Sequence, residues 1–394
     1  MSESTEPIFS PEALSRYSRH IRLPQIGLAG QQRLAEARVL LIGMGGLGSP
    51  AALYLAAAGV GTLGLADFDT IEGHNLQRQI LHDTPGIGRP KLDSAAEKLQ
   101  ALNPEVTLNR HPAGIAPDNA LALLADYDLV VDGSDNFPTR YLVNDACVLA
   151  GKPLIYGSLF QFEGQVSVFD PANGAPCYRC LFPQPPEPGT VPNCEEAGVF
   201  GALCGVIGSL QAMEAIKLIA GVGASLTGRL LVVDALGMAF RTLTLKKDPG
   251  CPCCGHEPTI TRLDPEHYAA INCAVEPEPP AGPGTTAPDD LPLEVDVEQG
   301  RRLIDAGAAV LDVREPYETA ICQIPDSLLI PMGEIAGKWS YLPQDRPVVV
   351  TCHHGARSLQ VTRFLRERGL EQTTSLAGGV DAWAREVDPA MQRY

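Results

Sequence analysis

Positive charge is scarce in this sequence. Its 394 residues include 30 Lys and Arg against 47 Asp and Glu, which gives a formal net charge of −17. Direct nucleic-acid binding needs cations that displace counterions from phosphates, and anionic membrane surfaces attract basic segments, so both partners are disfavoured. The N-terminus has no charged-then-apolar signal pattern, and no uninterrupted apolar run is long enough to span a bilayer. We therefore expect a cytoplasmic protein.

Other signatures are missing as well. The sequence has neither a G-x-x-x-x-G-K-[ST] phosphate loop nor a protein-kinase signature, so it is not one of those ATP enzymes. It has 11 cysteines, an odd number in a protein expected to be cytoplasmic, where thiols stay reduced. They indicate metal ligands, nucleophiles or core residues rather than disulfides.

A stretch rich in Pro and Gly, residues 276–292, divides the chain and cannot bury enough surface to fold alone. We expect a first domain at 1–272, a flexible linker at 273–292 and a second domain at 293–394. Strand-like runs alternate with helical patterns in both domains. The first domain is predicted to be a doubly wound, mostly parallel α/β sheet, and the second a small α/β domain. The expected strands lie at 38–42, 63–66, 128–132, 153–156, 165–169, 310–312 and 348–350, with a late hairpin at 229–245 and helices at 47–58, 199–218, 298–306 and 357–368.

A glycine-rich motif follows the first expected strand and opens a helix. Its glycines are Gly43, Gly45, Gly46 and Gly48. Such glycines let the backbone approach a phosphate, which then faces the helix N-terminus. Asp67 ends the second strand, where an acidic residue can hold ribose hydroxyls. NAD enzymes share this pattern, so the motif alone leaves a dehydrogenase as an alternative.

Three further features favour ATP over a dinucleotide. Residues 69–79 are dense in polar side chains, Lys91 stands 13 residues beyond Arg78, and Ser134-Asp135-Asn136 follows the strand at 128–132. Arg, Lys and Asn can neutralise and position phosphates, and a carboxylate can hold magnesium, which a dinucleotide does not need. The sequence therefore predicts an ATP site.

Residues 10–262 resemble the MoeB/ThiF family of adenylyltransferases. The matching stretches are RYSRHIRLP, VLLIGMGGLGS, DFDTIEGHNLQRQ, IGRPK, DGSDN, CYRC, GVIGSLQAMEAIK and PGCPCCG. Gly73-His74 departs from the residues that usually precede Asn-Leu. The resemblance implies a homodimer in which Arg19 reaches into the partner subunit's ATP site. It also implies that Asp67 binds ribose, that Asn75, Arg78, Gln79 and Lys91 hold phosphates, and that Asp135 binds magnesium.

Two C-x-x-C pairs indicate a metal site. Cys177, Cys180, Cys251 and Cys254 can supply four thiolates to a closed, structural zinc site. A redox pair or buried free thiols would be the alternative, and the family resemblance favours zinc. Cys253 is expected to be a bystander and Cys204 a core residue. Cys194, in a Pro- and Gly-containing loop between the pairs, aligns with a cysteine that some relatives use to form a thioester or to resolve an acyl disulfide.

The second domain has a cysteine loop between a strand and a helix, from Cys352 to Arg357. Backbone N–H groups, the helix dipole and Arg357 would stabilise a thiolate or persulfide there. Protein phosphatases are the alternative, but their loops place five residues between Cys and Arg, whereas this one has four. With LDVRE, LIP and LAGGVDAW, residues 293–385 resemble a rhodanese domain. Asp312 and Arg314 are expected to be structural, and Gln323–Ser327 departs from the usual HIPGA.

The two resemblances together imply one reaction sequence. The C-terminal glycine carboxylate of a ubiquitin-like sulfur carrier (MoaD/ThiS-like, ending Gly-Gly) is adenylylated with ATP, and a persulfide on Cys352 then converts it to a thiocarboxylate. The sulfur donor would be thiosulfate or a cysteine desulfurase. The alternative is an activating enzyme that passes a ubiquitin-like protein to protein targets by thioester. The pathway stays open among molybdenum cofactor, thiamine, tRNA thiolation and other sulfur metabolism.

Overall fold

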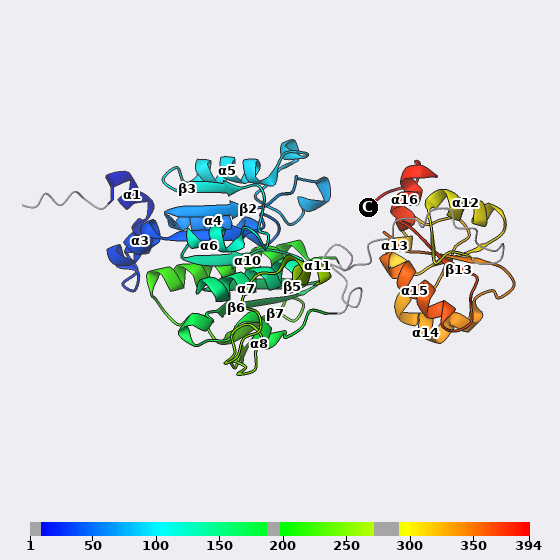
Figure 1. The fold of residues 1–394 in the computed structure, drawn as a ribbon. Helices are drawn as coiled ribbons and strands as arrows, with labels where there is room; N and C mark the ends of the chain where they lie inside the picture. The colour runs from blue at the N-terminus through cyan, green and yellow to red at the C-terminus, as the bar shows by residue number, and fades with distance from the viewer. Residues whose placement is uncertain (1–8, 187–197, 272–290) are drawn as a thin grey trace, which may run out of the picture. The chain divides into compact units, whose positions relative to one another are not determined.

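A computed structural model describes residues 9–186, 198–271 and 291–394 of the protein. They form two compact units, residues 9–186 with 198–271 and residues 291–394, which are described separately (Figure 1). The predicted linker at 273–292 lies almost wholly outside the described residues, so its boundaries stay predictions.

The first unit is built on an eight-stranded sheet with the order β3-β2-β1-β4-β5-β6-β7-β8. The neighbouring strands from β3 to β5 run parallel, whereas β6, β7 and β8 extend the sheet by antiparallel pairing. This confirms the predicted doubly wound, mostly parallel architecture. The strands are β1 (Arg38–Ile42), β2 (Thr62–Ala66), β3 (Thr107–His111), β4 (Leu129–Asp132), β5 (Leu154–Phe160), β6 (Glu163–Phe169), β7 (Arg229–Asp234) and β8 (Ala239–Thr244).

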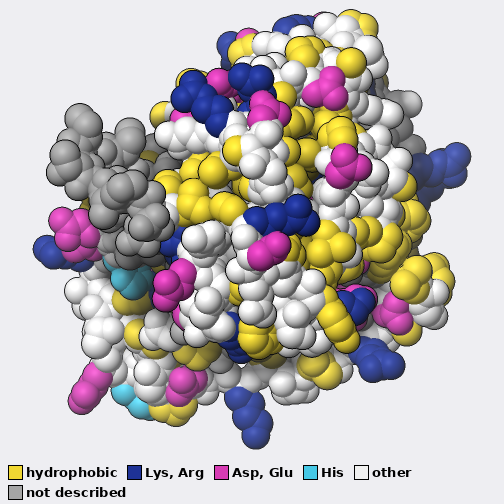
Figure 2. Space-filling view, turned by 90° about the vertical axis from the view of Figure 1, so that its right-hand side faces the viewer, with side chains coloured by type: hydrophobic (Ala, Val, Ile, Leu, Met, Phe, Trp, Pro, Cys, Tyr) yellow, Lys and Arg dark blue, Asp and Glu magenta, His cyan; other side chains and the backbone are white. Residues whose placement is uncertain are grey.

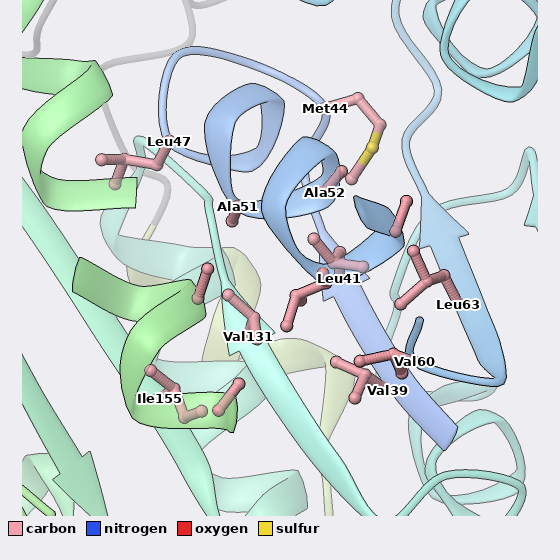
Figure 3. Close-up of a cluster of buried hydrophobic side chains, with 14 of the residues drawn as sticks. Val39, Leu41, Met44, Leu47, Ala51, Ala52, Val60, Leu63, Val131 and Ile155 are labelled. Carbon is pink, nitrogen blue, oxygen red and sulfur yellow. The ribbon is translucent and has the colours of Figure 1, made fainter. Parts of the chain in front are cut away.

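Two hydrophobic layers cover this sheet. On one face, α4 (Gly48–Ala58), α5 (Lys91–Leu102) and α10 (Gly201–Ala220) bury the larger core. Figure 3 shows Ala51 and Ala52 of α4 above the side chains of the strands, where their small size lets the helix lie close to the sheet. The other face carries α6 (Ala120–Ala125), α7 (Phe137–Ala150), α8 (Tyr178–Leu181) and α11 (Pro265–Ile271). The remaining helices are α1 (Pro11–Arg16), α2 (Ser18–Ile21), α3 (Gly27–Glu36), η1 (Gly73–Asn75), η2 (Thr84–Gly86) and η3 (Pro171–Asn173).

Helix α10 is apolar along most of its length. Among the described residues it is the one helix long and apolar enough to cross a membrane. It packs against α4 and against β5 and β6 of the sheet, and Cys204 and Ile207 lie in the core. This is the packing of a core helix, and the expectation that Cys204 is a core residue is confirmed.

The second unit contains a five-stranded parallel sheet with the order β11-β10-β12-β13-β9. Helices α14 (Ile335–Lys338) and α15 (Ala356–Arg366) cover one face, and α12 (Val297–Asp305) and α16 (Gly379–Glu386) cover the other. The remaining elements are β9 (Glu294–Val295), β10 (Ala309–Asp312), β11 (Leu328–Leu329), β12 (Val348–Thr351), β13 (Thr373–Leu376), α13 (Pro316–Thr319), η4 (Met332–Glu334) and η5 (Trp339–Tyr341).

The segment that departs from HIPGA forms a turn in which Ile324 is buried. Asp326 stands where that motif has glycine and adopts a φ of +58°, which an aspartate tolerates at some cost.

Charged side chains of both signs share the surface. On the face that Figure 2 shows, Lys and Arg lie among acidic and hydrophobic side chains rather than in one basic patch. This arrangement agrees with the scarcity of cations in the sequence.

Candidate functional site

A pocket opens at the carboxyl ends of β1, β2 and β4, where the strand order reverses. Ligands of open α/β sheets bind at such switch points. The pocket and its open mouth together hold about 870 Å³ of space not filled by protein atoms. The sequence-predicted residues that line it are Gly43, Gly45, Gly46, Asp67, Arg78, Gln79, Lys91 and Asp135.

The glycine loop is shaped by close backbone packing. Gly43 has a φ of +85°, and a Cβ there would stand 2.9 Å from the carbonyl oxygen of Gly133, in the loop after β4. A Cβ on Gly48 would stand 1.8 Å from the carbonyl oxygen of Gly43. Only glycine fits at these two positions. The loop then leads directly into α4, whose N-terminal N–H groups are suited to an anion.

Asp67 joins the loop to the end of β2. The residue is 8% exposed, and its carboxylate accepts hydrogen bonds from the backbone N–H of Met44 at 2.7 Å and of Asp69 at 2.8 Å. Burial raises the pKa of Asp67, while the Met44 N–H and the charge of Lys91 act in the opposite direction. Asp67 therefore fixes the glycine loop in addition to lining the pocket.

The predicted phosphate-binding residues come together on the loop after β2 and the start of α5. Lys91, 6% exposed, pairs with Asp69 at 2.7 Å. Arg78 is half-buried and donates to the carbonyl oxygen of His74 at 3.0 Å. Gln79 is buried, and its Oε1 has no hydrogen-bond partner among the described residues. Asn75 is buried at the end of η1, where its Oδ1 accepts from the Glu72 N–H at 3.2 Å.

Asp135 is exposed on the loop after β4. Buried Asp132 fixes that loop, since its Oδ1 accepts from the N–H and the hydroxyl of Ser134 at 2.9 and 2.6 Å. Arg140 donates to the Ser134 carbonyl oxygen at 3.2 Å. Asn136 caps α7 by accepting from the Thr139 N–H. Asp135 is thus a solvent-facing carboxylate on a firmly held turn, a setting suited to a hydrated magnesium ion.

Of the residues predicted for the nucleotide site, Gly48 and Asn75 do not line this pocket. Two further predicted residues are not brought to it either. Arg19 lies on α2, exposed, and does not line the pocket of its own chain. Cys194 lies outside the described residues. The roles predicted for both stay predictions.

The four predicted metal ligands form one cluster. The Sγ atoms of Cys177, Cys180, Cys251 and Cys254 all lie within 4.8 Å of one another, with 3.4 Å between Cys180 and Cys254 and 4.0 Å between Cys177 and Cys180. Tetrahedral zinc with bonds of about 2.3 Å sets its sulfurs about 3.8 Å apart, so this donor set fits zinc. Cys253 is buried beside the cluster and is not a member of it.

The first knuckle of the cluster is tied to α7 by a buried ion pair. Arg179, between two of the cysteines, donates to Asp145 through Nε at 2.8 Å and Nη2 at 2.7 Å. Tyr268 of α11 donates to the same carboxylate at 2.9 Å. The cluster therefore joins α8 and the segment after β8 to the helical layer, which is a structural role.

Cys352 begins the loop between β12 and α15. The residue is only 1% exposed. The backbone N–H of Gly355 donates to its Sγ at 3.1 Å, and Sγ lies 3.5 Å from the hydroxyl of Ser358. The glycines at 378 and 379 pack directly on the loop, because a Cβ on Gly379 would meet the Cys352 carbonyl oxygen at 2.3 Å. Backbone atoms of the loop and of the segment packed on it thus surround a single sulfur atom closely.

Arg357, which is expected to help stabilise a sulfur anion, also has a carboxylate partner in the structure. Its guanidinium does not face the sulfur alone, because it forms a two-pronged ion pair with Glu318 at 2.8 and 2.7 Å. The bonds to Glu318 raise the pKa of Arg357. Burial raises the pKa of Glu318, but hydrogen bonds from Arg357 and from the Glu315 N–H outweigh it, so its pKa is lowered. The Gly355 N–H donates to the sulfur, the thiol itself donates to the Ser358 hydroxyl oxygen, and Arg357 contributes through its charge.

His353 and the Asp312–Arg314 pair surround this loop. Burial, followed by the charge of His354, lowers the pKa of His353 to about 4. Its ring stacks on that of His354, with centroids 4.0 Å apart, and lies tilted against that of Tyr394, with centroids 4.3 Å apart. Asp312 and Arg314 are fully buried and bonded to each other at 2.7 Å, in the structural role expected of them.

Comparison with known proteins gives a consistent result for both units. The ThiF family matches residues 17–253, and the rhodanese-like domain matches residues 296–386. The chain is 45% identical to "Probable adenylyltransferase/sulfurtransferase MoeZ" of Mycobacterium tuberculosis, with 100% of both chains covered. It is 42% identical to "Adenylyltransferase and sulfurtransferase MOCS3" of Mus musculus, covering 98% of this chain and 88% of the mouse protein.

The first unit has relatives of its own. A "Sulfur carrier protein adenylyltransferase" of Thermus thermophilus is 54% identical over 259 residues, covering 65% of this chain and 96% of that protein. Among solved structures, E. coli MccB with MccA-N7isoASN superposes with a TM-score of 0.56 at 23% identity, covering 61% of this chain and 75% of that one. At that identity the likeness shows a shared fold.

Proposed function

The chain belongs to the ThiF family and continues into a rhodanese-like domain, and from this membership we propose how its own residues activate a sulfur carrier and deliver the sulfur. The enzyme is an adenylyltransferase and a sulfurtransferase, like its full-length relatives. The observation that carries the proposal is the presence of two separate sites on one chain. One is a phosphate loop with converging cations, and the other is a buried cysteine held by backbone donors.

In the first site, the terminal carboxylate of a carrier ending in Gly-Gly attacks the α-phosphorus of ATP. A bond forms between the carboxylate oxygen and phosphorus, and pyrophosphate leaves with the electrons of the broken P–O bond. The carboxylate is already ionised at neutral pH, so no base has to remove a proton. Lys91 and Arg78 neutralise the phosphate charge, Gln79 and Asn75 orient the oxygens, and Asp67 holds the ribose.

Magnesium fits the exposed carboxylate of Asp135, and when bound it would neutralise charge on the phosphates. Zinc fits the four-cysteine cluster and would be structural. Arg19 is proposed to complete the site of a second copy of the chain, since it does not line its own pocket. That homodimer and the cytoplasmic location remain predictions.

In the second site, the Cys352 thiolate takes a sulfane sulfur from the donor. With thiosulfate as donor, the S–S bond breaks and sulfite leaves. The terminal sulfur of the persulfide then attacks the acyl carbon of the adenylate and AMP leaves, giving an acyl disulfide. A second thiol attacks Sγ of Cys352 and releases the carrier thiocarboxylate, which leaves a disulfide that an external reductant opens. Cys194 is the candidate for that thiol.

The test separates the two sites on the full chain. Cys352→Ser keeps an acceptor for the Gly355 N–H but provides no thiolate. It should therefore leave carrier-dependent ATP–pyrophosphate exchange intact and abolish both thiosulfate:cyanide sulfurtransferase activity and thiocarboxylate formation. Intact mass of a MoaD-type carrier reads the product directly, because replacing oxygen by sulfur adds about 16 Da. Cys322→Ser, at a partly buried cysteine of the same unit, is the matched control.

Thiocarboxylate formed by Cys352→Ser without another sulfur donor would refute the proposal. A wild-type product that is a thioester to a target protein would instead support the conjugation alternative.

A further inference from the structure

A buried histidine connects the phosphate loop to the helix that carries Lys91. His82 is 6% exposed and does not line the pocket. Its Nε2 lies 2.9 Å from the carbonyl oxygen of Met44, and its Nδ1 lies 3.1 Å from the hydroxyl of Ser94. A carbonyl oxygen can only accept, so Nε2 carries the proton, and in the neutral ring Nδ1 accepts from Ser94. Both ring nitrogens are therefore engaged.

The same peptide segment is held from its other side. The Met44 N–H donates to Asp67 at 2.7 Å, while the Met44 carbonyl oxygen is bound by His82. The middle of the glycine loop is thereby fixed between the end of β2 and the His82 ring. Polar groups buried in this way cost free energy when they lose a partner, so each bond constrains the loop.

Ser94 and Lys91 lie together in the first turn of α5. The chain of contacts runs from the loop through His82 to Ser94, and so to the helix turn that presents the lysine. Lys91 is in turn bonded to Asp69 in the loop after β2. Together these contacts join the glycine loop, the end of β2 and the first turn of α5, which form the wall of the pocket where the predicted phosphate-binding groups lie.

We propose that His82 is a positioning residue for adenylyl transfer, which holds the glycine loop and Lys91 in register without touching the nucleotide. This inference rests on the proposed nucleotide site. Catalysis by positioned charges is sensitive to small displacements, since a shift of about 1 Å can cost roughly 100-fold in rate. His82 therefore acts on the rate of transfer more than on ground-state nucleotide binding.

The surroundings of the ring keep it in the neutral form that this role uses. Burial lowers the pKa of His82, and the charges of Lys91 and Lys98 lower it further. The Met44 carbonyl oxygen and the charge of Asp67 oppose them without reversing the shift. The lowered pKa therefore favours the neutral ring, in which Nε2 donates to the Met44 carbonyl oxygen and Nδ1 accepts from Ser94.

The experiment measures carrier-dependent ATP–pyrophosphate exchange, with a MoaD-type carrier ending in Gly-Gly as the probe, and separates kcat from KM for ATP. His82→Leu should lower kcat about 10- to 100-fold while KM changes less than about 3-fold. His82→Gln can both donate and accept, and should recover most of that loss. Ser94→Ala removes one of the two bonds with little change of volume and should lower kcat about 3- to 10-fold.

The matched control is Asn103→Leu. Asn103 is fully buried in the same unit and donates to Tyr17 and to the Ala56 carbonyl oxygen, away from the pocket. The Asn103→Leu variant should have a lower melting temperature and an unchanged kcat. The inference is overturned if folded His82→Leu retains wild-type kcat, or if Gln is no better than Leu. If His82→Leu does not fold, wild-type kcat in Ser94→Ala overturns it. A wild-type enzyme without exchange would refute the proposed function itself.

Discussion

The buried ion pair between Asp145 and Arg179 joins the cysteine cluster to helix α7, and its contribution to stability can be tested directly. The Asp145 side chain is fully buried and that of Arg179 is 2% exposed. The carboxylate also accepts from Tyr268 and from Asn144, both at 2.9 Å. Asp145→Ala removes all of these acceptors at once and leaves a guanidinium without its counter-charge. Breaking a buried pair in this way costs about 3–5 kcal/mol of unfolding free energy.

An exposed pair of the same length supplies the comparison. Arg110 and Asp93 are also 2.7 Å apart, but their side chains are 55% and 46% exposed. Such pairs contribute about 0–1 kcal/mol. Asp93→Ala should therefore cost at most about 1 kcal/mol, although its N–O distance is equal to that in the Asp145 pair. Burial, not distance, decides the magnitude.

Calorimetry of the full chain provides the measurement. Both tryptophans, Trp339 and Trp383, lie in the second unit, so tryptophan fluorescence follows that unit alone and serves as the internal control. Asp145→Ala should lower the transition of the first unit and leave the tryptophan transition in place. Combining Asp145→Leu with Arg179→Met should restore much of the loss, because apolar replacement of a whole buried pair is often neutral. Equal costs for Asp145→Ala and Asp93→Ala would refute the reasoning.

Four shorter predictions concern the sites themselves. Asp135→Asn should abolish carrier-dependent pyrophosphate exchange while the protein stays folded, because the amide is a poor magnesium ligand; exchange near wild type would remove Asp135 from that role. Mixing inactive Arg19→Ala with inactive Asp135→Asn should restore activity through hybrid dimers, and hybrids shown to form but inactive would reject action in trans. Reduced protein should contain one zinc per chain by metal analysis and lose it on Cys180→Ser, and unchanged zinc would count against the cluster. Folding lowers the pKa of His353 from 6.5 to about 4, so the unfolded chain binds a proton at a higher pH than the folded one. The free energy of unfolding of the second unit should therefore fall by about 1–2 kcal/mol as pH falls from 6.5 to 4. His353→Gln should remove this pH dependence, as followed by tryptophan fluorescence.

Much of the fold was predictable because the strands are buried and apolar. The run at Arg38–Ile42 and the late hairpin both form as expected. Strand β3 was missed, since Thr107–His111 is polar and only partly buried at the sheet edge. Its place is set by pairing with β2, which no local pattern encodes. Strands β9 and β11 have two residues each, too short for any periodicity to appear.

Site residues could be predicted where the residue type and its spacing indicate one kind of site. They were missed where their role depends on contacts between residues far apart in the sequence. Cysteines at C-x-x-C spacing led to the cluster that the structure brings together. His82 carried no comparable signal, because its partners lie 38 residues before it and 12 after it in the chain. The pairing of Arg357 with Glu318, 39 residues apart, also could not be predicted from the cysteine loop alone.

The two sites share a strand–turn–helix arrangement of the backbone but are proposed to carry out different chemistry. In each, a parallel strand ends, the chain turns sharply, and a helix begins, so that N–H groups converge on one point. Each loop also packs closely on another segment through a glycine: a Cβ on Gly43 of the first loop would meet Gly133, and a Cβ on Gly379, which packs on the second loop, would meet the Cys352 carbonyl oxygen. The side chains make the difference. Around the first loop stand Lys91 and Arg78, whose charges suit the proposed triphosphate, whereas the second loop closes on a single thiol and the Arg357 guanidinium is already paired with Glu318. A site whose cation is engaged suits a sulfur atom held by backbone donors better than a multiply charged phosphate, which is why the second loop favours sulfur transfer over phosphatase chemistry.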